Sequence, residues 1–145
     1  MVQGGRIVER SEVDNPLNAP FSYIGFQIKV DFYVLPLIVN QKPVLDGIFL
    51  VNHSCAPNAG FSDSLTLISI RAIAKGEEIC FDYAMTDVQT DDKIEWDEME
   101  CKCNSPDCRR RITGTDWKLP DLQRKYKGYF SPHVAVEIAK LNPTE

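Results

Sequence analysis

Two groups of residues in this 145-residue chain have the types and the spacing that chemistry requires. The first is the segment Asn52-His53-Ser54-Cys55, in which an imidazole and a thiol stand two residues apart. Such a segment could supply a nucleophile with its base, a metal ligand with its neighbours, or a polar turn. The second group is formed by Cys101, Cys103 and Cys108, which place three thiols close together.

The three clustered cysteines are candidates for a zinc site, because zinc needs thiolates that converge in a tetrahedron. A structural zinc usually takes four ligands, and the remaining candidates in the sequence are Cys55, Cys80, His53 and His133. Cys80 stands in an apparent strand and is expected to be a small buried hydrophobic residue, so Cys55 is the better fourth ligand. Three unrelated free thiols remain the alternative, because CxCxxxxC is less diagnostic than two CxxC pairs.

The composition is that of an ordinary folded domain, with 43% hydrophobic and 26% charged residues. The length favours one domain. No apolar run approaches the ~20 residues of a membrane span, and the first residues contain no secretory signal. We therefore expect an intracellular protein with no membrane partner, whose five cysteines stay reduced.

The net charge of −5 is spread unevenly along the chain. Residues 86–100 (TDVQTDDKIEWDEME) hold most of the excess acid, and this segment could attract a basic tail, although a solvated linker is the other interpretation. The three arginines at 109–111 are expected to form a solvated face. No direct contact with nucleic acid is expected from so short a basic run.

Short strands should position these groups. Residues 21–35 alternate in polarity, which predicts one strand with Gln27 on its polar face and Phe26 on its buried face. Further strands are expected at 65–72 and 78–83, either paired as a hairpin or joined by a short loop after the Lys75-Gly76 turn.

Helices are expected only near the end of the sequence. Pro120 predicts one or two helical turns over residues 121–126, and Ser131-Pro132 predict the start of a second helix. That helix would place Val134, Ile138 and Leu141 on one face. The expected fold class is mainly β.

Three segments, in this order, resemble the SET-domain protein lysine methyltransferases. They are residues 52–58 (NHSCAPN), residues 76–83 (GEEICFDY), and the CxCxxxxC-R segment that is similar to a post-SET motif. The resemblance implies a SET-type fold of short strands with a pseudoknot-like NHSC segment. It also implies a reduced SET domain at 1–100, a post-SET zinc-binding segment at 101–115, and a C-terminal helical tail at 116–145 packed on the same domain.

The resemblance implies methyl transfer from S-adenosylmethionine to a lysine side chain of a protein substrate that has an exposed lysine. In such proteins the catalytic residue would be Tyr83, whose hydroxyl would orient the lysine amine. The cofactor contacts would come from Asn52, His53 through its backbone, Tyr83 and Ile112. A structural Zn²⁺ would be held by Cys55, Cys101, Cys103 and Cys108.

Two departures from the family pattern leave a second function open. The Gly-x-Gly turn that wraps the methionine part of the cofactor has no match in Gly4-Gly5, and Arg110 stands where a glycine often follows the post-SET Cys-Arg pair. A cofactor that loses this turn would bind weakly or need another chain, so a homo-oligomer is one expectation. The alternative function is a catalytically silent, zinc-stapled SET-like module for protein interaction.

Overall fold

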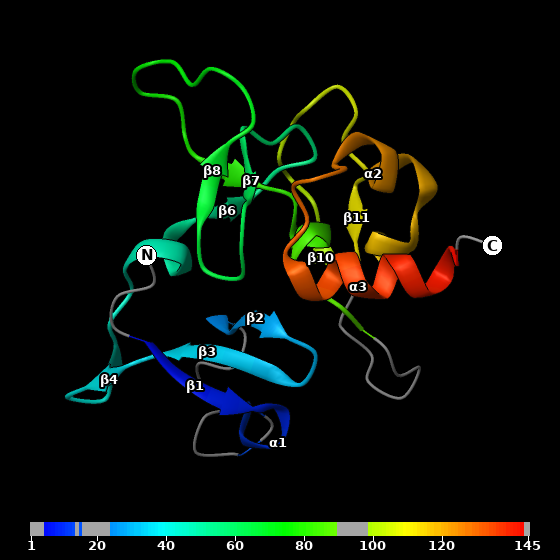
Figure 1. The fold of residues 1–145 in the computed structure, drawn as a ribbon. Coiled ribbons are helices and arrows are strands. Elements are labelled where there is room, and N and C mark those ends of the chain that lie inside the picture. Colours follow the sequence, from blue (N-terminus) through cyan, green and yellow to red (C-terminus); the bar gives the residue numbers. More distant parts are fainter. Residues whose placement is uncertain (1–4, 14, 16–23, 90–98, 144–145) are drawn as a thin grey trace.

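The computed structural model describes residues 5–13, 15, 24–89 and 99–143. Figure 1 shows three groups of short elements: an N-terminal sheet, a set of strand pairs above it in this view, and the C-terminal helices beside them. Among the described residues, no helix has the length and the apolar character needed to cross a membrane. The mainly β fold class expected from the sequence is confirmed.

The N-terminal sheet is antiparallel and has the strand order β1-β3-β2. It consists of β1 (Gly5–Glu9), β2 (Phe26–Lys29) and β3 (Phe32–Pro36), with the short helix α1 (Arg10–Val13) after β1. The single strand predicted over residues 21–35 is wrong, because the chain turns at Val30 and Asp31 and makes a hairpin. Asp31 adopts a left-handed conformation with φ 66°, which aspartate tolerates better than most residues. The hydrophobic alternation continues across this turn and therefore conceals it.

Gln27 is buried, with 1% of its surface exposed, although its position in the pattern predicted a solvent-facing side chain. The Val88 backbone N–H donates to Gln27 Oε1 at 2.7 Å, and Gln27 Nε2 donates to the Val88 carbonyl at 3.4 Å. The Gln27 side chain thus makes with the Val88 backbone the two hydrogen bonds that a neighbouring strand would otherwise make. It fastens β2 to the chain that follows Tyr83.

Replacing Gln27 by alanine should lower the free energy of unfolding by about 1–3 kcal/mol, because both polar groups of Val88 would lose their partner in a buried place. Urea titration followed by circular dichroism would measure the loss. Lys29→Ala on the same strand is the control, since Lys29 is exposed and should change stability by less than about 0.5 kcal/mol. Equal effects of the two substitutions would contradict the structural role of Gln27.

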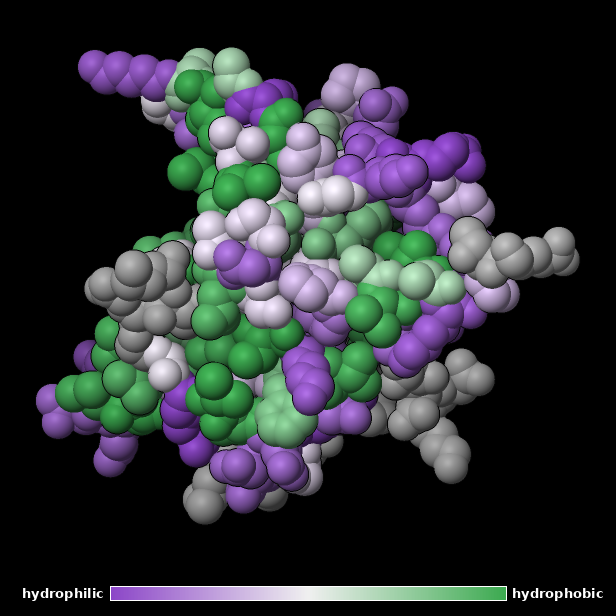
Figure 2. All heavy atoms as spheres, in the orientation of Figure 1, coloured by the Kyte–Doolittle hydropathy of each residue, from purple (hydrophilic) through white to green (hydrophobic). Residues whose placement is uncertain are grey.

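A second hairpin follows the sheet, formed by β4 (Ile38–Val39) and β5 (Lys42–Pro43). Asn40 and Gln41 both have positive φ, 50° and 61°, which is the backbone of a type I′ turn. Exposed apolar side chains gather on β1, on this hairpin and on the residues up to the end of η2 (Gly47–Leu50). They are Ile7, Leu37, Ile38, Val39, Val44, Leu45 and Leu50. Figure 2 shows hydrophobic atoms on the lower left of the molecule, where Figure 1 places β1 and β4.

The middle of the chain forms two separate strand pairs. Strand β6 (Asn52–His53) runs parallel to β9 (Cys80–Phe81), and β7 (Ala59–Phe61) runs antiparallel to β8 (Leu67–Ser69). The strands at 65–72 and 78–83 are therefore shorter than predicted and do not form a hairpin with each other. Gly76 makes the expected turn between them, with φ 87°. The parallel pair brings the NHSC segment beside GEEICFDY, as the family resemblance implied.

The C-terminal part contains β10 (Met99–Glu100) paired with β11 (Arg111–Ile112), then η4 (Asp116–Lys118), α2 (Pro120–Lys125) and α3 (Pro132–Leu141). Both predicted helices are confirmed, and each has proline at its start. Val134 is buried and Ile138 packs on the core, but Leu141 is exposed. The main core joins residues from all parts of the chain: Phe26, Phe61, Phe81, Ala84, Met85, Val88, Trp117, Leu122, Tyr126, Phe130 and Val134.

Candidate functional site

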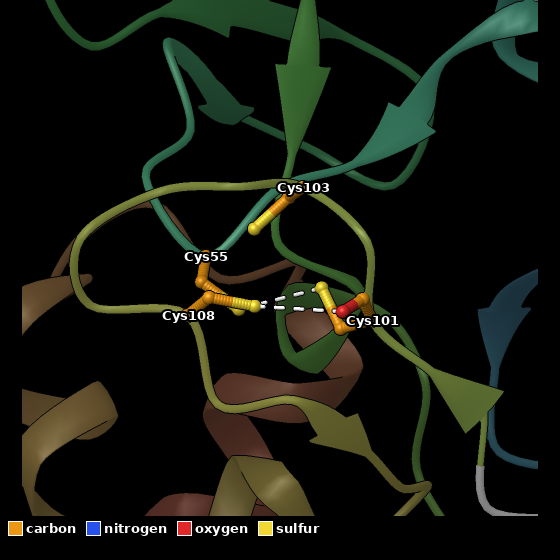
Figure 3. A group of neighbouring side chains, drawn as sticks. All are labelled: Cys55, Cys101, Cys103 and Cys108. Carbon is orange, nitrogen blue, oxygen red and sulfur yellow. Dashed lines mark hydrogen bonds between the residues drawn. The ribbon is translucent and has the colours of Figure 1, made fainter.

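Four cysteine side chains converge at one point, although they come from two distant segments (Figure 3). Cys55 lies in the loop after β6, while Cys101, Cys103 and Cys108 lie in the loop between β10 and β11. All four sulfur atoms are within 4.8 Å of one another. The Sγ atoms of Cys55 and Cys101 are 3.8 Å apart, and a zinc tetrahedron with Zn–S bonds of ~2.3 Å has edges of roughly that length. The donor set and its spacing therefore fit zinc.

Backbone amides surround the sulfur atoms. The N–H of Arg109 donates to Cys55 Sγ, and the N–H of Arg110 donates to Cys108 Sγ, both at 3.4 Å. Burial raises the pKa of the Cys55 and Cys101 thiols, so these thiols need a bound cation to be held as thiolates. Backbone N–H donors of this kind stabilise such thiolates once they have formed.

Arg110 has a positive φ of 65°, and it is the position at which the family often has glycine. A non-glycine residue in this conformation costs about 1–2 kcal/mol. Its carbonyl accepts from the Cys101 N–H at 2.8 Å, so the turn closes the cysteine loop.

Arg110→Gly should raise the free energy of unfolding slightly, by about 0.5 kcal/mol, because relief of strain exceeds the entropy that glycine adds to the unfolded chain. Arg111→Gly is the matched control and should lower it by about 0.5–1 kcal/mol, since Arg111 is in strand β11. Urea titrations of both zinc-loaded variants would measure these changes. A loss of stability in both would show that the turn is not strained.

His53 connects the cysteines to Tyr83. Its Nδ1 accepts the Tyr83 backbone N–H at 3.1 Å, so in the neutral ring Nε2 carries the proton, and Nε2 lies 3.3 Å from Cys55 Sγ. Burial lowers the pKa of His53, which favours this neutral form. The His53 ring also packs edge-on against Tyr83, with 5.1 Å between centroids. The two ring nitrogens of His53 thus connect the Tyr83 backbone to the Cys55 sulfur.

A buried ion-pair network holds the cysteine loop on the rest of the fold. Asp82 is fully buried and accepts two hydrogen bonds from the Arg109 guanidinium, at 2.6 and 2.8 Å. Arg109 Nε donates to Asp116 at 3.0 Å. The expectation that residues 109–111 form a solvated face is wrong for Arg109, whose side chain is only 16% exposed, but holds for the two exposed arginines that follow.

Helix α2 and the residue after it hold the same region from the other side. Lys125 Nζ donates to the Cys55 carbonyl at 2.8 Å, and the Tyr126 hydroxyl donates to Asp82 at 2.9 Å. Sequence reasoning missed Asp82, Arg109 and Tyr126 as supports of the site. The local signals were that Asp82 lies inside the GEEICFDY segment, one residue before Tyr83, and that Arg109 is the arginine of the CxCxxxxC-R segment.

Tyr83 begins the short helix η3 (Tyr83–Met85) and lies where two cavities meet. The first is a cleft of about 130 Å³, open to solvent, and its wall is largely apolar and aromatic. The second is a narrow space of only about 10 Å³ beside Ile112, Thr113 and Gly114. Tyr83, Asp87 and Met99 line both cavities. Residues lining the first cleft alone are Ile24, Gly25, Phe26, Ile48, Phe49, Val51, Phe81 and Thr86.

The other residues singled out from the sequence differ in burial and in the cavities that they line. Ile112 is buried against Cys55 and Cys101 and lines the second cavity. Asn52 is exposed, donates to Glu78 Oε1 at 2.6 Å, and lines neither of these two cavities. Cys80 lies outside the four-thiol cluster as predicted, but it is partly exposed and not fully buried. Most of the acidic segment at 86–100 lies outside the described residues.

The family model of the SET domain matches residues 6–84, which is more than half of the chain. The chain is 32% identical over 102 residues to "Histone-lysine N-methyltransferase ash1" of Drosophila melanogaster, covering 63% of this chain and 4% of that protein. It is also 32% identical over 85 residues to "Histone-lysine N-methyltransferase 2D" of Homo sapiens, covering 50% of this chain and 1% of that protein. The chain thus spans only a few per cent of the length of these relatives.

Proposed function

Since this chain belongs to the SET domain family, we propose that it transfers a methyl group from S-adenosylmethionine to a lysine side chain of a protein. Its relatives in Drosophila melanogaster and Homo sapiens are named as histone-lysine N-methyltransferases, which supports a protein lysine as the acceptor. The observation that carries the proposal is the position of Tyr83 at the junction of two cavities, one of which is an apolar cleft.

The cleft suits the side chain of lysine. Phe26, Phe49 and Phe81 give it an aromatic wall against which four methylene groups can pack. At pH 7 the neutral amine costs about 4–5 kcal/mol in water, since the pKa of lysine is near ~10.4. Burial in an apolar channel reduces this cost, because desolvation penalises the ammonium.

Tyr83 is proposed to orient the substrate amine. Burial raises the pKa of its phenol, so the hydroxyl stays neutral and its oxygen can accept an amine N–H. S-adenosylmethionine, when bound, would supply the methyl group, and the Tyr83 hydroxyl would direct the lone pair of the substrate nitrogen toward it. Positioning and the loss of the sulfonium charge would supply most of the rate.

S-adenosylmethionine would supply the methyl group. Ile112 lines the second cavity but is only 5% exposed, so this space would have to open before an adenine ring could pack against it. Asn52 would have to exchange its hydrogen bond with Glu78 before its amide could bind the cofactor.

A structural zinc held by Cys55, Cys101, Cys103 and Cys108 is part of the proposal. Purified protein should contain one zinc per chain, and Cys55→Ser should lower that content. The same change should speed amide hydrogen exchange in residues 101–112, because the cysteine loop would lose its attachment to β6. Cys80→Ser is the control and should retain the metal. An equal zinc content in Cys55→Ser and the unmutated protein would contradict this ligand set.

The experiment that tests the activity has two stages. Calorimetry with zinc-loaded protein would measure binding of S-adenosylmethionine, and transfer of a radioactive methyl group to a mixture of proteins would measure turnover. We expect heat of binding and label on lysine. A protein that gives no heat at millimolar cofactor would instead be a zinc-stapled interaction module without turnover.

A further inference from the structure

Asp87 is a carboxyl group inside the cleft that the mechanism above does not use. It lines both cavities together with Tyr83, and its backbone N–H donates to the Tyr83 carbonyl at 2.9 Å. This backbone hydrogen bond fixes Asp87 next to the proposed acceptor channel.

The Asp87 carboxyl has little to balance its charge. Thr86 Oγ1 donates to Oδ1 at 3.3 Å, and no lysine, arginine or histidine within the described ranges forms an ion pair with it. Among the described residues, the titratable groups nearest to it in charge interaction are Tyr83 and Asp82, and Asp82 is already paired with Arg109. His133 binds the Thr86 carbonyl and is kept neutral by burial, which lowers its pKa.

Burial raises the pKa of Asp87 to about 7. A carboxylate in a largely apolar cleft is stabilised by a cation that enters the cleft, and Asp87 is the only charged residue among the described residues that line it. A primary ammonium at the end of an aliphatic chain has the shape and the charge that this arrangement would accept.

We propose that Asp87 binds the ε-ammonium of the incoming lysine and then accepts its proton, which leaves the neutral amine beside Tyr83. This inference rests on the proposed function for the identity of the ligand. The step is balanced: the ammonium loses one proton to the carboxylate, giving a neutral amine and a carboxylic acid that later returns the proton to water. Burial disfavours both charges of the ion pair relative to the neutral amine and carboxylic acid, so the transfer is less unfavourable than it would be with an exposed carboxyl.

A binding experiment without cofactor tests the first part. Nuclear magnetic resonance of protein labelled at isoleucine and methionine methyl groups would follow Ile48 and Met99, which line the cleft, during titration with n-butylammonium or 1-butanol. Between pH 6 and 8.5 the ionised fraction of a group with a pKa near 7 rises from about a tenth to nearly all. We therefore expect n-butylammonium to bind roughly tenfold more tightly at pH 8.5, while 1-butanol shows no such change.

Asp87→Asn should remove this pH dependence, and Asp121→Asn should leave it intact, because Asp121 is exposed on α2 and lines neither cavity. Carbon-13 resonances of the aspartate carboxyls in the unmutated protein provide a second measurement, in which n-butylammonium should lower the pKa of Asp87. Equal binding of n-butylammonium by the unmutated protein and Asp87→Asn at pH 8.5 would overturn the inference. So would an Asp87 pKa that does not respond to n-butylammonium.

The second part is tested by turnover. If the protein methylates lysine, we expect kcat/KM to fall below pH 7 and Asp87→Asn to remove that fall, whereas replacing a purely structural residue would scale the profile without changing its shape. A retained acid limb would refute proton acceptance. The titration with n-butylammonium does not depend on methyl transfer. The proposed function and the role of Asp87 can therefore fail separately.

Discussion

Arg109→Ala should lower the free energy of unfolding by about 3–5 kcal/mol, which is a large part of the stability of a domain of this size. The reason is Asp82, which is fully buried and receives two hydrogen bonds from the Arg109 guanidinium. Without Arg109 its charge would remain in the interior, where its other described neighbours are the Ala84 N–H, the Tyr126 hydroxyl and the His53 ring. Urea titration of zinc-loaded protein measures the change.

Arg124→Ala is the matched control. Arg124 is also an arginine paired with an aspartate, Asp121, but both side chains are largely exposed. Such surface pairs contribute about 0–1 kcal/mol. If the two substitutions had the same effect, the network around Asp82 would not be the support that we describe.

The same network explains what the sequence could not predict. Three arginines in a row have the same local pattern whether they are solvated or buried, and only the contacts with Asp82 and Asp116 distinguish Arg109 from its neighbours. Gln27 is a similar case, because its partner Val88 is 61 residues away. Partners at such distances leave no periodic or compositional signal.

Other features were predictable because their signals are local. Pro120 and Pro132 each open a helix, since proline fits the first turn. The convergence of Cys55 with the later cysteines was predicted from the order of the family motifs and not from the spacing of the cysteines. Strand pairing was predicted least well: β6 and β9 have two residues each, and their parallel register depends on the packing around them.

Tyr83→Phe should lower kcat for methyl transfer by about 100-fold while leaving stability and cofactor affinity nearly unchanged. The ring would keep its contacts with His53 and Phe81, at centroid distances of 5.1 and 5.2 Å, because only the hydroxyl is removed. The backbone N–H that binds His53 is also unaffected. What is lost is the oxygen that fixes the direction of the amine lone pair, and misplacement of reacting atoms by about 1 Å can reduce the rate on that scale.

Tyr129→Phe provides the control, because Tyr129 is partly buried and lines neither of the two cavities beside Tyr83. Single-turnover assays at saturating cofactor would separate the chemical step from binding. A normal rate in Tyr83→Phe would exclude this hydroxyl from the reaction. A rate lowered together with stability would mean instead that Tyr83 is a packing residue, whereas a loss confined to kcat places its hydroxyl at the reacting amine.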